Sequence, residues 1–509
     1  MEKKVFLADH IITMAKETKP EAILSIDGRI AFVGGQDEVL KQAGEGAEVF
    51  DFTGAAILPG FIDAHSHICA YANRLALADL TKAACFDDIV SILREFKRTH
   101  NVAPEQWIIG FGYDNNFLKE KRHPDKNLLD QVSQENPVLV NHISGHMGAL
   151  NTSALQETGA PGDGYLEETE FMRYCAKVPA PDDSQMQNLM QQAQQVYLSY
   201  GITTAQEGIA KEREVKLLQE APLSIDVVAY VDMKNTKQAY DRGGIYKTRY
   251  KDHLRLGGYK IFLDGSPQGK TAWMSKPYEG EKSYAGYGTY QDAEVTAFFE
   301  TALRENVQIL VHCNGDAACE QFIRCLRRAC EKTGLPIRNR PVMIHAQTVT
   351  EKQLASLKEL NCIVSFFNAH TYFWGDIHAK NLGARAERIS PMQTAQALGL
   401  CYTLHQDTPV IEPNMLLSVW CALTRQTRQG RVLGAQECIG VYDALRAVTT
   451  NGAYQYFEEH DKGTIENGKR CDLAVLAQNP LTAGTDEIKD ISVLATIKDG
   501  KVLYRRKER

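Results

Sequence analysis

The feature that most constrains the fold of this chain is a series of eight short apolar runs that alternate with polar clusters and helical stretches. This alternation is typical of parallel strands joined by crossover helices. It predicts a (β/α)8 barrel, because a doubly wound open sheet usually has fewer strands and a Gly-rich nucleotide turn, and no such turn occurs here. The runs cover 55–65, 201–207, 224–231, 258–264, 307–312, 341–345, 362–367 and 400–407, with helices expected at 293–306, 317–332, 351–360 and 391–398.

The two ends of the chain have a different pattern, with short β segments and tight turns. Asp27-Gly28 and Asp499-Gly500 are sequences that favour two-residue hairpins. Neither end has enough apolar residues for a core of its own, so we expect both termini to form one small β-sandwich. The predicted domains are residues 1–58 and 455–509 for the sandwich and 59–454 for the barrel, with an insertion at about 68–195 over the barrel mouth.

Composition narrows the class of protein. A net charge of −7 and a pI near 6.1 give no basic surface for nucleic acid, and no run of about 18 apolar residues is present to cross a membrane. The apolar stretch near the start stops at Asp9, too early for a signal-peptide core, and the 12 cysteines are scattered with no Cys-x-x-Cys pair. We therefore expect a cytoplasmic protein with reduced thiols and a small-molecule partner; a homo-oligomer is left open.

Polar residues at the predicted strand ends suggest a metal site. Catalytic residues of α/β barrels lie at the carboxyl ends of the strands, and alternate residues of a strand point the same way. Four histidines and one aspartate there form a nitrogen and oxygen set suited to a divalent cation, with zinc expected. A single histidine is more often a surface or core residue whose ring nitrogens are already hydrogen-bonded. The prediction therefore depends on the whole set: His65, His67, His312, His345 and Asp407.

Lys260, on the fourth predicted strand, is unusual at such a position. A lysine ammonium is repelled by a nearby cation, so the alternative is a structural ion pair or a lysine that extends to solvent. Lys260 becomes a metal ligand only if it is neutral or is converted by CO2 to a carbamate. A carbamate has two anionic oxygens and can bridge two metal ions.

Several motifs resemble those of the amidohydrolase superfamily, and in particular its YtcJ-like branch, which includes N-substituted formamide deformylase. They are LPGFIDAHSH at 58–67, YKIFLDGS at 259–266 with QGKTA at 268–272, GHMGALN at 145–151, the strand ends at 311–312, 344–345 and 406–407, and GTIENGK at 463–469. The resemblance runs nearly end to end. It implies the barrel and the split sandwich.

The resemblance also implies roles for the ligand residues. His65, His67 and Asp407 hold one metal ion, and His312 and His345 hold a second, with carboxylated Lys260 as the bridge. If Lys260 is unmodified, the site holds a single ion. Asp407 acts as general base and then general acid for a water activated by the metal.

Aromatic and histidine residues near the expected barrel mouth suggest a substrate with an apolar or aromatic portion. His146 is expected to stabilise the oxyanion and to contact substrate, and Trp273, His370 and Tyr372 are expected to bind substrate. The alternative is that these residues only pack the inserted segment. His370 and His146 are favoured because they occur in polar sequences expected to be turns.

We expect hydrolysis of a carbon–nitrogen bond of amide type other than a peptide bond, in an N-formyl or N-acyl amine. One alternative is a deaminase or cyclic amide hydrolase on the same barrel, although the nearest glutamate to the fifth strand is Glu320, in a predicted helix. Another is a non-catalytic, ligand-binding regulatory protein. The complete ligand set weighs against that class, since binding alone does not require Lys260 and Asp407.

Overall fold

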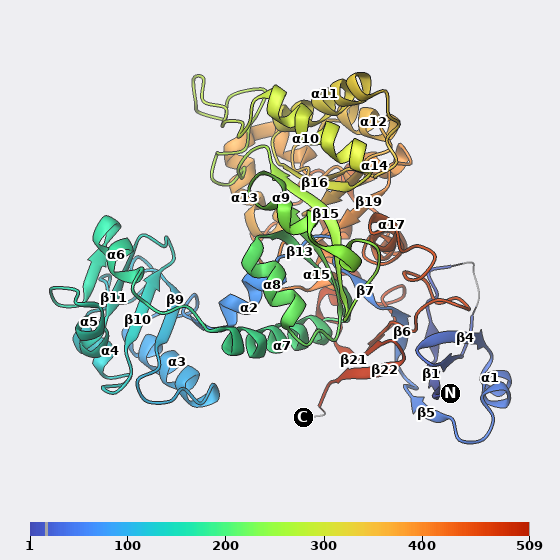
Figure 1. Cartoon of the computed structure of the whole chain (residues 1–509), viewed down its shortest axis with the longest axis horizontal. Coiled ribbons are helices and arrows are strands. Elements are labelled where there is room, and N and C mark those ends of the chain that lie inside the picture. Colours follow the sequence, from blue (N-terminus) through green and yellow to red (C-terminus); the bar gives the residue numbers. More distant parts are fainter. Residues whose placement is uncertain (16–18, 508–509) are drawn as a thin grey trace. The chain divides into compact units, whose positions relative to one another are not determined.

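The structure is a computed structural model that describes residues 1–15 and 19–507. The chain forms two compact units (Figure 1), one of Met1–Ala70 with Ala193–Arg509 and one of Tyr71–Gln192. Two helices, α2 (Ile68–Leu75) and α7 (Asp183–Ser199), run across the boundaries between them. Within the described residues, no helix combines the length and the apolar character needed to cross a membrane.

An eight-stranded parallel sheet forms the centre of the first unit, with its strands in chain order. Beyond the last strand and the first, the Asp407 N–H donates to the His65 carbonyl (3.2 Å) and the His67 N–H donates to the Thr408 carbonyl (2.7 Å). The ends of the first and last strands are therefore hydrogen-bonded to each other. The strands are β7 (Phe61–Ile62), β13 (Ile202–Ala210), β14 (Asp226–Asp232), β15 (Leu254–Phe262), β16 (Gln308–Cys313), β17 (Val342–His345), β18 (Ile363–Phe366) and β19 (Tyr402–Leu404).

Helices follow these strands and surround the sheet in Figure 1. In α11, apolar residues recur every three or four positions and are buried, as expected for a helix with one face on a sheet. The helix ends at Gly334, whose φ of +67° is a conformation that glycine adopts without steric cost. The helices are α8 (Glu212–Glu220), α9 (Met233–Asp241), α10 (Asp292–Glu305), α11 (Asp316–Thr333), α12 (Glu351–Glu359), α13 (His370–Leu382), α14 (Met392–Ala397), α15 (Met415–Thr424), α16 (Val441–Ala447) and α17 (Thr450–Gln455), with 3-10 turns at Gly244–Lys247, Gly383–Arg388, Ala435–Glu437 and Thr485–Asp490.

The first apolar run, expected as one strand over 55–65, forms two strands in different sheets. β6 (Ala56–Pro59) pairs with β20 (Leu473–Leu476) from the other end of the chain, whereas β7 belongs to the parallel sheet. Gly60 lies between them, where an added Cβ would come within 2.4 Å of the Thr203 hydroxyl oxygen. Both halves of the run are buried, so the run is apolar throughout. The sequence therefore gives no sign that the chain passes from one sheet to another.

The two chain ends supply two further sheets. One contains N-terminal strands alone, in the order β4-β3-β1-β5, and the other joins both ends in the order β2-β6-β20-β21-β22. Phe6, Ile23 and Ile57 from the first 58 residues share one buried cluster with Leu473 and Ile497. The remaining elements are β1 (Lys3–Leu7), β2 (His10–Ile11), β3 (Ala22–Ile26), β4 (Arg29–Gly34), α1 (Gln36–Ala43), β5 (Glu48–Asp51), β21 (Val493–Lys498) and β22 (Lys501–Arg505).

The second unit is a five-stranded sheet with helices on both faces. Val138 and Val140 of β10 belong to one buried cluster and Leu139, between them, to another, so successive residues enter different cores. Its elements are β8 (Ala78–Asp79), α3 (Phe86–Thr99), β9 (Ile108–Tyr113), α4 (Lys126–Asp130), β10 (Val138–His142), β11 (Met147–Leu150), α5 (Thr152–Thr158), β12 (Tyr165–Glu167) and α6 (Glu168–Cys175).

A buried ion-pair network joins the start of β14 to the C-terminal segment. The Asp226 carboxylate lies 2.6 Å from Lys462 Nζ, 2.9 Å from Lys498 Nζ and 2.7 Å from His253 Nδ1. Burial alone would raise the pKa of Asp226, but the two lysines hold it well below its ordinary value. Because Asp226, Lys462 and Lys498 are all buried, loss of one charge leaves the others without full compensation.

We therefore expect Asp226→Asn to lower the free energy of unfolding by about 3 kcal/mol. This is at the lower end of the range for breaking a buried ion pair, because Glu458 still contacts Lys462 and Asp472 still contacts Lys498. Urea denaturation followed by circular dichroism measures this loss. Asp241→Asn is the control, since Asp241 pairs with Lys237 on an exposed helix face and should cost less than about 1 kcal/mol. Equal losses in the two variants would contradict a structural role for the network.

Candidate metal centre

Three side chains at the carboxyl ends of parallel strands point their donor atoms at one another. His65 follows β7, His345 ends β17 and Asp407 follows β19. Their donor atoms all lie within 4.8 Å of one another, and this is the only such group of histidine, cysteine or acidic residues found in the described part of the chain. The structure therefore brings together three of the six predicted ligands, which are 342 residues apart at the extremes (407 minus 65).

His67 contributes a fourth donor and contacts two carboxylates. Its Nε2 lies 3.4 Å from Asp407 Oδ1, and its Nδ1 lies 3.5 Å from Glu207 Oε1, at the end of β13. Burial alone would lower the pKa of His67, but its contacts with Asp407 and Glu207 raise it to about 9. The surroundings of His67 thus favour positive charge.

Lys260 is fully buried and has no ion-pair partner among the described residues. Its Nζ lies 3.2 Å from His65 Nε2, and Asp407 acts on it only at longer range. Burial lowers the pKa of Lys260 to about 7. The position is therefore next to the candidate ligands, as expected, and unfavourable for a charged ammonium.

The imidazole of His312 packs against that of His345, with 4.5 Å between ring centroids. Its Nε2 lies 3.1 Å from the Gly265 carbonyl oxygen and 3.1 Å from Asn314 Nδ2. His312 therefore lies beside the three converging residues, while its Nε2 contacts the segment after β15.

Three residues of the site, His405, Gln206 and Glu207, were not predicted from the sequence. His405 is fully buried, with Nε2 3.1 Å from His345 Nδ1 and Nδ1 2.8 Å from the Ser365 hydroxyl. Gln206 contacts His65 Nδ1 at 2.6 Å through its amide oxygen. His405 stands two positions before Asp407, so strand alternation was a signal for it; Gln206 and Glu207 were visible only as two polar residues ending an apolar run.

Two candidate ligands have a left-handed backbone. The φ angle is +73° at His345 and +53° at Asp407, a region that L residues seldom adopt. Residues held in such conformations cluster at functional sites, where the surrounding structure compensates for the strain. In both cases the left-handed residue lies at or just after the carboxyl end of a strand, where the chain changes direction.

The donor set fits a divalent cation. Asp407 Oδ1 is buried and makes no hydrogen bond with the described residues, although ring nitrogens of His65 and His67 lie 3.4 Å from it. A buried polar atom without a hydrogen bond is costly unless another group satisfies it. Imidazole nitrogens and a carboxylate oxygen are ligands that zinc binds well.

The expected substrate residues lie in several environments. His146 is in the second unit and half exposed, with Nδ1 3.5 Å from Glu168. Trp273 lines a cavity of about 550 Å³ with Glu320, Arg324 and Lys352, and no candidate ligand borders that cavity. The Tyr372 ring packs on Trp420, with 5.3 Å between centroids.

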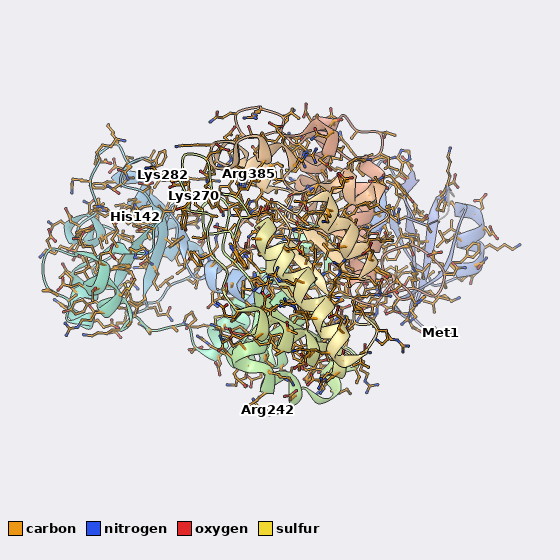
Figure 2. The ribbon with its side chains drawn as sticks, turned by 90° about the horizontal axis from the view of Figure 1, so that it is seen from above. Met1, His142, Arg242, Lys270, Lys282 and Arg385 are labelled. Atoms are coloured by element: carbon orange, nitrogen blue, oxygen red, sulfur yellow. The ribbon has the colours of Figure 1, made fainter. Side chains whose placement is uncertain are left out.

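His370 was expected in a polar turn, but it is the first residue of the helix α13 and is buried. Aromatic packing accounts for the burial of His370 at the start of this helix, because the Phe367 and Trp374 rings lie 4.5 Å and 4.6 Å from the His370 ring, centroid to centroid. Arg385, labelled in Figure 2, donates to the carbonyls of Lys276 and Pro277 and so holds the end of α13 to the loop after β15.

Comparison with known proteins agrees with this geometry. The model of the amidohydrolase family matches residues 48–504. The chain belongs to the amidohydrolase family. It is 24% identical to N-substituted formamide deformylase of Arthrobacter pascens (97% of this chain, 96% of that protein) and 23% identical to the putative amidohydrolase YtcJ of Bacillus subtilis strain 168 (99% and 100%).

Among solved structures, an uncharacterized metal-dependent hydrolase from Pyrococcus horikoshii OT3 is similar, with a TM-score of 0.78 and 22% identity over 96% of this chain and 100% of that one. At this level of identity the likeness shows a shared fold. The predicted resemblance to the amidohydrolase superfamily and its YtcJ-like branch is confirmed.

Gly208 offers a test of the site that changes no ligand. An added Cβ would lie 2.6 Å from His65 Cε1 and 2.8 Å from His67 Cε1, so Gly208→Ala displaces both rings. We expect metal affinity to fall by about 10- to 100-fold, the usual effect of disturbing residues that orient ligands. Metal titration of the purified protein measures it. The control Gly440→Ala adds a methyl with only Asp443 Oδ2 near it, at 3.8 Å; the same affinity in both variants would contradict the assignment.

Proposed function

We propose that this chain is a metal-dependent hydrolase that cleaves a carbon–nitrogen bond of amide type other than a peptide bond. The observation that carries the proposal is the convergence of His65, His345 and Asp407 at the carboxyl ends of parallel strands, with an Asp407 oxygen left for a cation. The similarity to a protein named N-substituted formamide deformylase supports N-formyl or N-acyl amines as the substrate class.

We propose a closed (β/α)8 barrel over residues 59–454 with an insertion at about 68–195. The two backbone hydrogen bonds that join the ends of β7 and β19 support closure. Residues 1–58 and 455–509 are proposed to form one β-sandwich, and the buried cluster that draws on both ends supports it.

His65, His67 and Asp407 would hold one divalent cation, with zinc proposed because the donors are mainly imidazole. His312 and His345 would hold a second if Lys260 is a carbamate. That modification is supported by the lack of an ion-pair partner for Lys260 among the residues that the structure describes. A cation bound there supplies Lewis acidity, which polarises a carbonyl group and makes water more acidic.

In the mechanism we propose, Asp407 takes a proton from the attacking water and delivers it to the leaving nitrogen. Contacts to His65, His67 and His345 keep the pKa of Asp407 well below its ordinary value despite burial, so it starts as a carboxylate. Gln206 holds the His65 ring through Nδ1, which directs His65 Nε2 toward Asp407. His146 is proposed to stabilise the oxyanion.

The substrate is proposed to be a small molecule with an apolar or aromatic portion. Phe367, Trp374 and His370 form an aromatic group beside His345 and His405, which supports an apolar contact near the reacting bond. Trp273, Tyr372 and His146 are proposed as further substrate contacts.

A panel of N-formyl and N-acyl arylalkylamines, assayed for amine release with the metal-loaded protein, tests the proposed function. Release of the amine supports it. Turnover of cyclic amides or of exocyclic amino groups, with metal bound, would instead assign ring opening or deamination. A protein that binds ligands normally with near-zero metal content would be a regulatory protein.

Asp407→Asn tests the proton-transfer role. We expect kcat to fall by about 10²- to 10⁴-fold, the usual contribution of general acid–base catalysis. Steady-state rates on the best substrate of the panel are compared with metal content in the same samples, because Asp407 is also a proposed ligand. Full turnover in a metal-loaded Asp407→Asn protein would contradict the role, and Asp241→Asn is the control on an exposed helix face.

Lys260→Arg tests the carbamate. If Lys260 bridges two ions, the wild-type protein reconstituted with bicarbonate should hold two metal ions per chain, and Lys260→Arg, which cannot form a stable carbamate, should hold at most one. Elemental analysis of the desalted protein gives the ratio. One ion per wild-type chain with and without bicarbonate would instead assign a single-ion site.

A further inference from the structure

Helix α13 contains a second pair of histidines, separate from the candidate ligands. His370 Nδ1 lies 3.0 Å from His378 Nε2, and the two ring planes differ by only 9°. Both rings are buried, and burial lowers the pKa of each below its ordinary value. The pair is therefore two neutral imidazoles that share one proton in a hydrogen bond.

The pair lies one aromatic ring away from the candidate metal centre. The Phe367 ring is 4.5 Å from the His370 ring and 5.4 Å from the His405 ring, centroid to centroid. The charge of Asp407 also acts on His370. Phe367 thus links His370 to His405 at the strand ends, and a substrate that extends along this ring would meet His370.

The two possible directions of the hydrogen bond are not equivalent, because the outer nitrogens differ. His378 Nδ1 is buried and has no hydrogen-bond partner in the described part of the chain. His370 Nε2 has no such partner either, but unlike His378 Nδ1 it is not completely enclosed by protein atoms.

A neutral imidazole carries one proton, on one nitrogen. If His370 donated from Nδ1, His378 would carry its proton on Nδ1, where the described residues offer no acceptor. Buried N–H groups without acceptors are rarer in proteins than buried acceptors that lack a donor. The arrangement with His378 donating from Nε2 is therefore preferred, and it places the proton of His370 on Nε2.

We propose that His378 is a positioning residue that holds His370 in its Nε2–H form, and that His370 donates this hydrogen bond to the carbonyl oxygen of the substrate. The second part rests on the proposed amide hydrolysis. Negative charge develops on that oxygen when water attacks, and a preorganised donor stabilises it. The donor is neutral, so it adds no positive charge beside a cation.

The surroundings keep the pair in place. Phe367 and Trp374 contact the His370 ring, and Asp376, between the two histidines in sequence, accepts a hydrogen bond from the Thr427 hydroxyl at 2.8 Å. Asn381 donates to the carbonyls of Pro267 and Gln268, so α13 is anchored along its length.

Three variants of His378 separate the direction of the hydrogen bond from simple packing. The amide of His378→Gln can donate to His370 Nδ1, His378→Met fills similar space without a donor, and His378→Glu, assayed at a pH where its carboxylate is ionised, offers only acceptors. We expect near wild-type kcat for Gln and a fall of about 10- to 100-fold for Met and Glu, with KM changed less, because the donor acts mainly on the developing oxyanion. His460→Met, an exposed histidine, is the control.

Full activity of His378→Glu with loss in His378→Gln would overturn the proposal, since it would mean that His370 donates from Nδ1. Equal losses in all three variants would reduce His378 to packing and overturn it as well. Melting temperatures identify variants that fail to fold.

A neutron structure of the wild-type protein near neutral pH gives a readout without substrate. Deuterium on Nε2 of both His370 and His378 is expected, and deuterium on His370 Nδ1 would overturn the proposal. If no amide is hydrolysed, the proposed function fails and with it the carbonyl contact, while the deuterium positions still decide the role of His378.

Discussion

The candidate site depends on two backbone hydrogen bonds that join the chain after β7 to the chain after β19. The His65 carbonyl accepts from the Asp407 N–H, and the Thr408 carbonyl accepts from the His67 N–H. Parallel pairing in chain order separates the first and last strands by all the others, so only this junction brings His65 and His67 beside Asp407. The ligands of one proposed ion thus lie on both sides of this junction.

The second constraint is electrostatic. Several imidazoles and one amine are buried around the Asp407 carboxylate, and burial lowers the pKa of His65, His345 and Lys260. Neutral imidazoles are the form in which histidine binds a metal. The same burial that costs free energy therefore prepares the ligands, and the left-handed backbone at His345 and Asp407 adds to that cost.

The sequence was informative where one periodicity controls one element. Strand ends predicted at His312 and His345 fall within a residue of the observed ends of β16 and β17, and α12 begins at Glu351 as expected. The hydrophobic pattern was uninformative where a segment is buried against more than one part of the structure or is buried through polar residues. The run at 55–65 is apolar in both the terminal sheet and the parallel sheet. The buried face of α13 carries polar residues such as His370, Thr371 and His378, so no apolar helical stripe appears in its sequence.

His405, Gln206 and Glu207 were missed for a related reason. Each acts by holding another side chain, and a residue type that can hold an imidazole also occurs in ordinary polar loops. Spacing identifies the residues that face one point in space; it does not identify a partner that reaches them from a neighbouring strand, as Gln206 of β13 reaches His65.

The backbone near the candidate ligands is held by hydrogen bonds, and this limits which residues can determine substrate selectivity. Asp264, after β15, accepts hydrogen bonds from the backbone N–H groups of Asn314, Gly315 and Trp273, so the segments after β15 and β16 are held to each other. An added Cβ at Gly315 would lie 1.9 Å from the Trp273 carbonyl oxygen, which leaves no room for variation there. We expect selectivity to come from side chains outside this framework, and the aromatic face of α13 around His370 is one such group.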